Sequence, residues 1–428
     1  MRPTDPQELE RIRKAARILA AAVKPIKVLR AIEWDPAIRT RFFEQRAKEL
    51  PRPQYVPFDP APTQAALSEL RDIDIASPFI ADWIERQREA IETTALMMSA
   101  VGTADFYKHA RKLYGDPKTP LGLYPDVCNL DLATQVRDVL DRLGFLSIDL
   151  TPPEYHSAED VARTLKRACK RHFGTAAPTI EVVDVLSANA LAGPTSIRVR
   201  RDAKFTDRDA EQLLQHEAFI HVATSLNGRA QKDLPILALS HPYIARFQEG
   251  LAVLAEVLTG AMEMDRFARL ADRVFAIQKA IDGADFLEVY RYFLERTGKP
   301  EQAFQNTRRV FRGGVIEGGA PFTKDCVYLY GLIQASNTVR ALFAQGRPDC
   351  LPLLFCGKVD VLDLRALCEL AAMGLIKEPP FLPPWIKDPR SLFALLTYST
   401  FMTRLDMGPI VEKASELTRG IPPVRFAP

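Results

Sequence analysis

The sequence predicts a mainly helical α+β protein with one small β-sheet. Apolar residues recur at three- and four-residue intervals through most of the chain, which is the spacing of helices with one buried face. Residues 179–185 and 195–200 are instead rich in β-branched side chains or alternate apolar with polar ones, as strands do. With 428 residues, of which 47% are hydrophobic, the chain can bury a large core.

The first part of the chain is predicted to consist of helices. In residues 6–23, Ile12, Ala15 and Leu19 share one helical face. A proline-rich stretch at residues 51–62 interrupts the pattern, and beside it we divide the chain into a helical appendage (1–55) and a main domain (56–428). The other helices are expected at residues 24–29, 34–50, 63–73, 79–101, 104–114, 131–143 and, after a cap at Ser157, up to residue 172.

The predicted sheet comes directly before a helix of residues 207–225, which should stop at Asn227 and Gly228. Pro242 begins a second helix, in which Gly250 should let the first helix approach closely. Each predicted strand is either an edge that binds an extended peptide or simply part of the sheet. The core of the main domain is placed at about residues 150–345. The remaining helices are expected at residues 265–281, 284–296, 300–312 and 325–344.

The helix of residues 207–225 carries a pattern typical of a catalytic zinc site. His216 and His221 lie five residues apart with Glu217 beside the first, and Glu249 follows on the next helix. Two imidazoles and a carboxylate supply three ligands and leave one position open for water. In a regular α-helix, five residues turn the two rings roughly 140° apart, too far to share one ion. The interval therefore predicts a π-helical turn, with an i→i+5 bond in the segment from Glu217 to His221.

The two glutamates are expected to have different roles. Glu249 arrives from a separate helix and is the predicted third zinc ligand. Glu217 follows the first ligand directly, so it is the predicted catalytic base, which takes a proton from water on the metal and returns it to a leaving amine. The pattern thus indicates a metallohydrolase.

Three motifs resemble a known family. Gln248-Glu249-Gly250-Leu251-Ala252 resembles the pentapeptide of the bacterial QEGLA-motif (flavohemoglobin expression-modulating) proteins, which are related to the microtubule-associated tyrosine carboxypeptidases. The segments 322–331 and 352–359 resemble two further blocks of that family, and the likeness covers about residues 150–375. The resemblance implies a zincin-like metallopeptidase with His216, His221 and Glu249 as zinc ligands and Glu217 as the catalytic residue.

A carboxypeptidase must also bind a terminal carboxylate. Arg309, Arg312 and Lys324 are candidates, because Arg offers a bidentate fork and Lys a point charge, although each can equally form a structural ion pair. Tyr328 is a candidate donor to the oxyanion. His241 is a further candidate for substrate binding, or else a capping residue.

Charge and cysteine content narrow the class of protein further. The 57 basic and 54 acidic residues give a formal net charge of +3, which offers no electrostatic case for binding nucleic acid or a membrane. The six cysteines lack CxxC spacing, and no segment reaches the ~20 apolar residues that span a bilayer. We therefore expect a cytoplasmic zinc carboxypeptidase that acts on a peptide or protein C-terminus, in an oligomeric state that the sequence leaves open.

Two other readings of the same residues stay open. One is another zinc-dependent hydrolase or a dipeptidyl peptidase, which an acidic, amine-binding cluster near the site would favour. The other is a non-enzymatic regulator that contains zinc. The presence of Glu217 argues against the regulator, because a structural zinc site needs no base.

Overall fold

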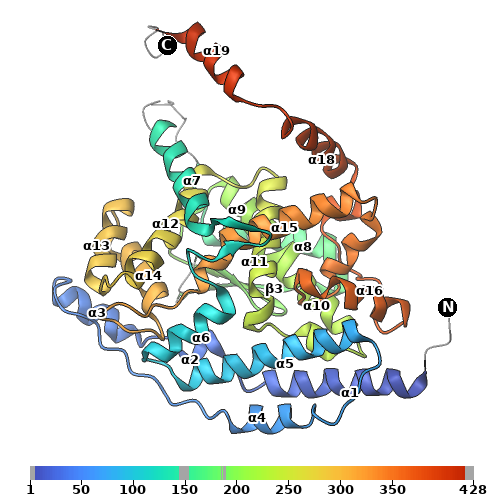
Figure 1. Cartoon of the computed structure of the whole chain (residues 1–428). Helices are drawn as coiled ribbons and strands as arrows, with labels where there is room; N and C mark the ends of the chain where they lie inside the picture. Colours follow the sequence, from blue (N-terminus) through green and yellow to red (C-terminus); the bar gives the residue numbers. More distant parts are fainter. Residues whose placement is uncertain (1–4, 144–153, 185, 187–188, 420–428) are drawn as a thin grey trace.

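The computed structural model describes residues 5–143, 154–184, 186 and 189–419 (Figure 1). It confirms a mainly helical α+β chain with small sheets. The elements of the first part are α1 (Pro6–Val23), α2 (Val28–Ala31), α3 (Pro36–Glu44), α4 (Ala61–Ser68), α5 (Pro78–Ser99), α6 (Ala104–Tyr114), β1 (Pro120–Leu121), β2 (Tyr124–Cys128), α7 (Asn129–Leu143), α8 (Ala158–Phe173), η1 (Gly174–Ala176), β3 (Thr179–Val183), β4 (Ala190–Ala192) and β5 (Ser196–Arg200).

The second part begins with the motif helix, which consists of three consecutive pieces. These are α9 (Asp207–Leu213), η2 (Leu214–Val222) and α10 (Ala223–Ala230). The elements that follow are η3 (Pro235–Ala238), α11 (Pro242–Leu258), α12 (Met264–Ile281), α13 (Phe286–Thr297), α14 (Pro300–Phe311), η4 (Lys324–Cys326), α15 (Val327–Ala344), η5 (Pro348–Phe355), η6 (Val361–Asp363), α16 (Leu364–Ala372), α17 (Pro384–Lys387), α18 (Arg390–Met402) and α19 (Gly408–Thr418).

Local cap chemistry fixes the start of several helices. The side chain of Asp5 accepts a hydrogen bond from the first turn of α1. Helix α8 starts behind the predicted cap, where Ser157 and Asp160 bond to each other's backbone N–H groups. Thr206 and Asp209 form the same reciprocal box at the start of α9. The motif helix therefore begins at a position that the sequence defines strongly.

The motif helix does not end where the sequence predicts, because α10 continues through Asn227 and Gly228. The side-chain amide of Asn227 donates to the carbonyls of Phe355 and Phe381 at 2.8 and 2.7 Å. A Cβ atom on Gly228 would lie 2.1 Å from the carbonyl oxygen of Leu237. Both residues thus lie within the helix and allow it to pack closely against neighbouring segments. The predicted stop is therefore wrong.

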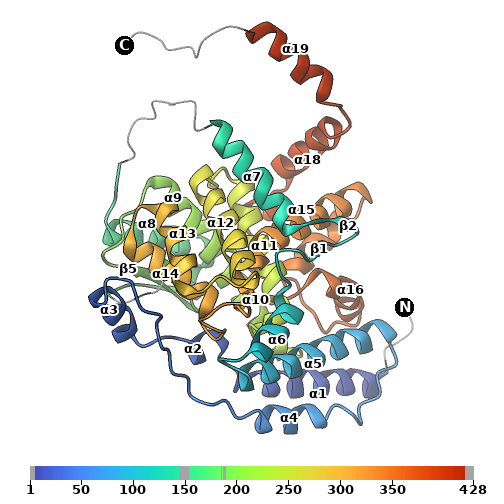
Figure 2. The same ribbon diagram turned by 60° about the vertical axis from the view of Figure 1, so that its left-hand side comes forward.

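Helix α11, which carries Glu249, packs along α15 in the middle of the molecule (Figures 1 and 2). The two helices meet at their glycines: a Cβ on Gly250 would lie 2.1 Å from the carbonyl oxygen of Gly331. A Cβ on Gly331 would lie 2.0 Å from the carbonyl oxygen of Arg246. The expectation that Gly250 admits the motif helix is therefore wrong, since the missing side chain makes room for α15.

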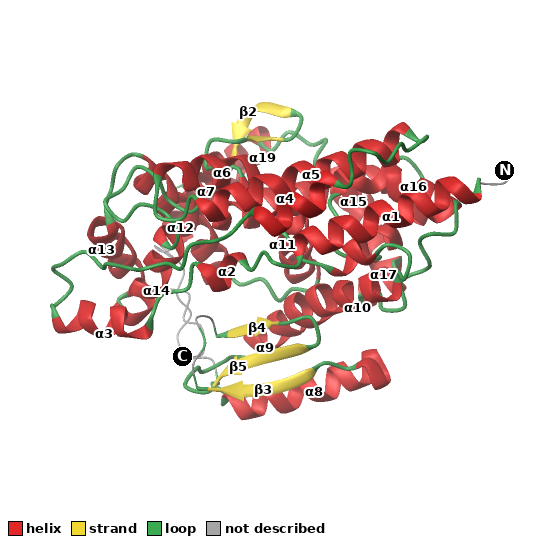
Figure 3. Cartoon of the chain, turned by 90° about the horizontal axis from the view of Figure 1, so that it is seen from below, coloured by secondary structure: helices red, strands yellow, loops and turns green. Residues whose placement is uncertain are grey.

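The three-stranded sheet has the order β3-β5-β4, with β3 parallel and β4 antiparallel to β5. In Figure 3 β4 is the strand nearest to the helical body. The predicted strand at 195–200 is therefore central, and it cannot serve as an edge. Residues 190–192 form the edge next to the motif helix, although the sequence Ala-Leu-Ala carries no strand signature. Val185, predicted to end β3, lies outside the described residues.

The two ends of the described chain are packed differently. Helix α1 buries Ile12 and Leu19 in the same hydrophobic cluster as Leu251 of α11 and Leu329 of α15. The domain boundary predicted at residue 55 stays a prediction. At the other end, α18 still buries Leu392 and Leu396 in that cluster, whereas α19 extends away from the body (Figure 2). None of the helices in the described ranges is long and apolar enough to cross a membrane.

Candidate metal centre

The interval between the two histidines is absorbed by a π-helix, as predicted. Element η2 is a π-helix, and at its end the N–H of Ala223 donates to the carbonyl of Ala218, five residues earlier. The rings of His216 and His221 consequently share one face of the helix, with centroids 4.9 Å apart and planes at 79°. The extra residue thus corrects the angle that a regular helix would impose.

Helix α11 brings Glu249 to the same place. Its Oε2 lies 3.6 Å from Nε2 of His216 and 3.5 Å from Nε2 of His221. The ligand atoms of the three residues lie within 4.8 Å of one another, and no other such metal-binding group occurs in the described part of the chain. Two imidazole nitrogens and a carboxylate oxygen match the donor set of a catalytic zinc ion.

A second carboxylate, which the sequence reading missed, orients the first histidine. Nδ1 of His216 lies 2.6 Å from Oε1 of the fully buried Glu256. Arg266 and Gln212 donate to that same oxygen at 3.2 and 2.8 Å. A carboxylate on Nδ1 fixes the ring with Nε2 free for a metal. This residue could have been predicted from the sequence, because Glu256 follows Glu249 by seven residues and so lies two helical turns further along the same face of α11.

The charges of these groups are set by one another. Burial lowers the pKa of His216, but hydrogen bonds to Glu249 and Glu256 outweigh it and raise that pKa to about 10. Burial acts against ionisation of Glu256, yet the charge of Arg266 lowers its pKa to about 2. The pKa of Glu249 is also held well below its usual value, despite burial, by Lys324 and the two histidines. Metal binding would therefore displace a proton from His216.

Glu217 lies outside the group of three and contacts the sheet. Its Oε2 accepts a hydrogen bond of 2.9 Å from the backbone N–H of Ala192 in the edge strand β4. The side chain is partly exposed. Glu217 thus joins the π-helical turn that carries both histidines to the edge strand β4.

The four predicted substrate residues have different surroundings. Lys324 donates from Nζ to Oε1 of Glu249 at 3.1 Å, so it contacts the metal group directly. Arg309 forms a bidentate pair with Asp325, at 2.6 and 2.7 Å. His241 stacks on Tyr243 at the start of α11, and both its ring nitrogens are buried without a partner. About 12 Å of helix separates His241 from Glu249, and no hydrogen bond or ion pair within the described residues joins it to the site.

Arg312 differs from Arg309, although both belong to the end of α14. Arg312 is 8% exposed, and its Nε has no hydrogen-bond partner. No ion pair joins it to a carboxylate within the described ranges. Its pKa falls to about 10, first because of burial and then because of repulsion by Arg309. Arg273 of α12, which the sequence reading also missed, has a pKa lowered to about 10 for the same two reasons.

Together these residues form a cation cluster, which we define as Arg273, Arg309, Arg312, Lys324, Asp325 and Tyr328. Asp325 holds Arg309 tightly and Arg273 loosely, at 3.7 Å. The hydroxyl of Tyr328 lies 3.5 Å from Arg309, and its ring lies under Lys324 and Arg273. Of the four cations, Arg309 and Arg273 thus pair with Asp325, and Lys324 pairs with Glu249.

A comparison with known protein families shows to which family this chain is related. The family described as microtubule-associated tyrosine carboxypeptidase matches residues 40–404. The chain belongs to this family. The resemblance predicted from the motifs is thereby confirmed, and the candidate metal group and the cation cluster both lie within the matched range. Among the curated proteins compared with this chain, none is similar enough to count as a match.

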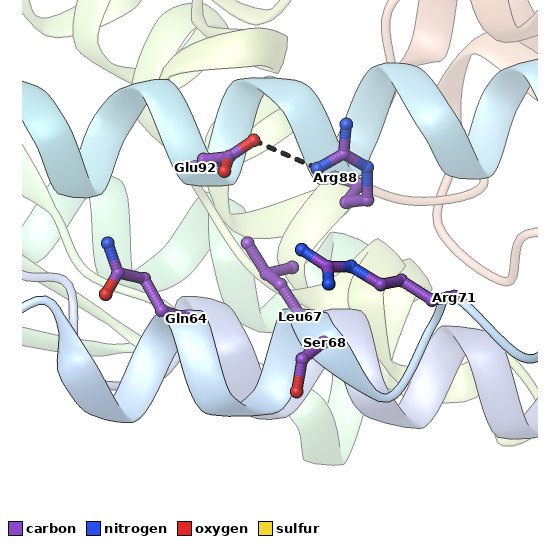
Figure 4. A pocket seen from close by; sticks show the side chains of 6 residues that line it. All are labelled: Gln64, Leu67, Ser68, Arg71, Arg88 and Glu92. Carbon is purple, nitrogen blue, oxygen red and sulfur yellow. Dashed lines mark hydrogen bonds and ion pairs between the residues drawn. The ribbon is translucent and has the colours of Figure 1, made fainter.

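A surface groove between α4 and α5 is separate from the carboxypeptidase motifs (Figure 4). Its lining consists of Gln64, Leu67, Ser68, Arg71, Arg88 and Glu92. Arg88 is neutralised within the groove wall, because it donates to Glu92 at 2.9 Å and to Glu85 at 2.6 Å. The groove contains none of the candidate site residues, and we assign it no role.

Proposed function

We propose that this member of the tyrosine carboxypeptidase family is a zinc-dependent enzyme that removes the C-terminal residue from a peptide or protein. The observation that carries the proposal is the group of His216, His221 and Glu249, whose ligand atoms lie within 4.8 Å of one another. Next to this group are Glu217, which is bonded to the backbone of Ala192, and an excess of cations. His216, His221 and Glu249 would hold the ion. A zinc ion held there would supply Lewis-acid chemistry, by polarising the scissile carbonyl and lowering the pKa of bound water.

Glu217 is the proposed base. Its Oε2 is held by the N–H of Ala192, so Oε1 is left to take a proton from the attacking water and to deliver it to the leaving amine nitrogen. The hydroxyl of Tyr328 is the proposed donor to the developing oxyanion, since it lies among the cations of the cluster and is bonded only weakly to Arg309.

The edge of β4 is the proposed binding place for the substrate backbone. Asn189 and Gly193 bond towards β5, so the alternation of an antiparallel ladder turns the backbone groups of Ala190 and Ala192 to the free edge. The N–H of Ala192 is the one that Glu217 accepts. An extended peptide added there would place a peptide bond next to the proposed base.

Arg312 is the proposed partner of the terminal carboxylate, because it is the buried arginine of the cluster without a carboxylate of its own. Arg273, which lies close to Asp325 and Tyr328, is proposed to support Arg312 in binding this carboxylate. Lys324 is better explained as a partner of Glu249: it binds Oε1 and leaves Oε2 facing the histidines. Arg309 is neutralised by Asp325 and serves to hold the cluster together.

The cation excess also separates this proposal from its rivals. A dipeptidyl peptidase has to bind a free amine, for which acidic side chains are suited, whereas Asp325, the one acid of this cluster, is already paired with Arg309 and Arg273. A purely structural zinc site would have no use for Glu217 or for an unpaired Arg312. Because the family carries the name of a tyrosine carboxypeptidase, a terminal tyrosine is the first residue to test.

The test uses zinc-loaded protein and a library of peptides that vary at the C-terminal residue. Mass spectrometry should show products shortened by one residue, and the same peptides with an amidated C-terminus should be resistant because they lack the carboxylate. The variant Glu217→Gln should keep its zinc and lose this activity. Equal shortening by wild type and variant, or no shortening of any free-acid peptide, would overturn the proposal.

A further inference from the structure

Lys358 is a buried cation at the back of the metal-binding turn. Its side chain is almost completely enclosed, with 5% of the residue exposed. Nζ donates to the backbone carbonyl of His221 at 3.0 Å and to the hydroxyl of Thr224 at 2.9 Å. No carboxylate within the described ranges forms an ion pair with it. Burying an ammonium group without a counter-ion is costly, so its presence calls for a specific purpose.

The carbonyl that Lys358 binds belongs to a metal ligand. It also accepts the hydroxyl of Ser225 at 2.8 Å. A π-helical turn interrupts the regular backbone ladder, and side-chain donors can satisfy the carbonyls at its end. Lys358 therefore stabilises the backbone conformation that brings the His221 ring to face the ring of His216.

Thr224 extends this contact to the second metal-bearing helix. Its hydroxyl lies 2.6 Å from the carbonyl of Ile220 and 2.9 Å from Oε1 of Gln248. Gln248 is buried and directly precedes Glu249. A chain of hydrogen bonds thus runs from Lys358 through Thr224 to the residue beside the third ligand, and it links η2 to α11.

The segment that carries Lys358 is itself fixed. The N–H of Lys358 donates to the carbonyl of Leu237 at 2.7 Å. Added Cβ atoms on Gly228 and Gly357 would lie 2.1 and 2.6 Å from that same carbonyl oxygen. Two glycines thus let three chain segments meet at one point, and the ammonium group is presented from a rigid base.

We propose that Lys358 is a positioning residue for the metal: it holds the carbonyl of His221 and, through Thr224 and Gln248, sets the separation between the histidine pair and Glu249. This inference rests on the proposed zinc site. If Lys358 positions the ligands, its removal weakens zinc binding. If Lys358 acts only as a positive charge, its removal strengthens zinc binding, because a positive charge close to a dication repels it. The sign of the change in zinc affinity therefore decides between positioning and simple repulsion.

The test measures zinc affinity by competition with a chromophoric chelator, with wild type and the variant Lys358→Met. Methionine fills a similar volume without the ammonium group. Loss of a residue that orients a ligand typically weakens metal binding by about 10- to 100-fold, and we expect about 10-fold here. The visible spectrum of the cobalt(II) protein should also change. Equal or tighter zinc binding by Lys358→Met would overturn the proposal.

Thr224→Val tests the same chain of bonds with a smaller change, and it keeps the proposal testable if Lys358→Met does not fold. It should weaken zinc binding in the same direction. The matched control is Thr94→Val in α5, where an equally buried threonine donates to the carbonyl of Ala90 and forms no hydrogen bond with a site residue in the described part of the chain. Zinc affinity unchanged in Thr224→Val, or lowered equally in Thr94→Val, would contradict the positioning role.

The outcome is independent of hydrolysis. If wild type binds zinc but cleaves no peptide, the proposed function fails while the affinity comparison still decides the role of Lys358. If wild type cleaves peptides and both variants keep full zinc affinity, only the positioning role fails.

Discussion

The metal group and the cation cluster lie side by side, but their side chains are satisfied to different degrees. On the metal side every ligand has a partner: His216 binds Glu256, the backbone of His221 binds Lys358, and Glu249 binds Lys324. On the cation side Asp325 neutralises Arg309, whereas Arg312 forms no ion pair with a carboxylate in the described part of the chain. One side has its geometry fixed in advance, and the other lacks an anion.

The difference indicates what each side binds. Two imidazoles and a carboxylate that are held in place by hydrogen bonds suit a metal ion, because its ligands must lie at fixed distances from it. A buried guanidinium without a counter-ion is relieved when a carboxylate arrives, and a bidentate contact then provides both energy and orientation. The pKa of Arg312, lowered to about 10 by burial and by Arg309, reflects that deficit. A peptide with a free C-terminus would complete both sides at once.

The largest effect is expected from Glu217→Gln. The substitution keeps the hydrogen bond to Ala192 possible but removes the proton acceptor, so the turnover number should fall by about 10²- to 10⁴-fold. Steady-state kinetics together with metal analysis measures both properties. A variant that has also lost its zinc would show that Glu217 helps to hold the metal and is not only a base.

Arg309→Met should mainly affect stability. It leaves Asp325 buried with only the distant Arg273, and breaking a buried pair in this way costs about 3 to 5 kcal/mol. Thermal or urea unfolding measures the loss. The double variant Arg309→Met with Asp325→Asn removes both charges and should recover much of it. Wild-type stability of the single variant would mean that Arg309 is free, like Arg312.

Arg312→Met should affect catalysis and spare stability. Losing a charged contact of about 1.5 to 3 kcal/mol corresponds to a fall in kcat/KM of about 10- to 150-fold, mainly through KM. Arg308→Met is the matched control, because Arg308 is a half-buried neighbour whose Nε has no hydrogen-bond partner and whose pKa is lowered overall by burial, although the charge of Glu33 raises it. If both variants raise KM equally, the distinction between Arg312 and the rest of α14 is lost.

Glu256→Gln should weaken zinc binding by about 10- to 100-fold, because the amide no longer provides the negative charge that orients His216. Chelator competition measures this value. The unfolding midpoint of the metal-free protein serves as the control for folding. An unchanged zinc affinity would show that the orientation of His216 does not depend on the charge of Glu256.

Much of the metal side could be predicted from the sequence because its information is local. The five-residue interval between His216 and His221 requires a π-turn, and Pro242 fixes the start of the helix that carries Glu249. Glu256 could also have been found, since it repeats on the face of Glu249. Lys358 could not have been found, because its bond to His221 joins residues 137 apart in the chain.

The cation side could be predicted only as a set of residue types. Arg309 and Arg312 carry the same local signal, and only the folded position of Asp325 distinguishes the paired arginine from the unpaired one. The edge strand β4 was missed for a related reason. Ala190 to Ala192 becomes a strand because β5 and the motif helix pack against it, which is tertiary context overriding weak intrinsic preference.

The most direct test of the central claim is a crystal structure of the zinc-loaded protein with anomalous data collected on both sides of the zinc absorption edge. We predict one zinc peak at about 2.0 to 2.2 Å from the imidazoles of His216 and His221 and a carboxylate oxygen of Glu249, with no protein atom in the fourth position. No peak between these three side chains, or a fourth protein ligand closing the site, would contradict the account.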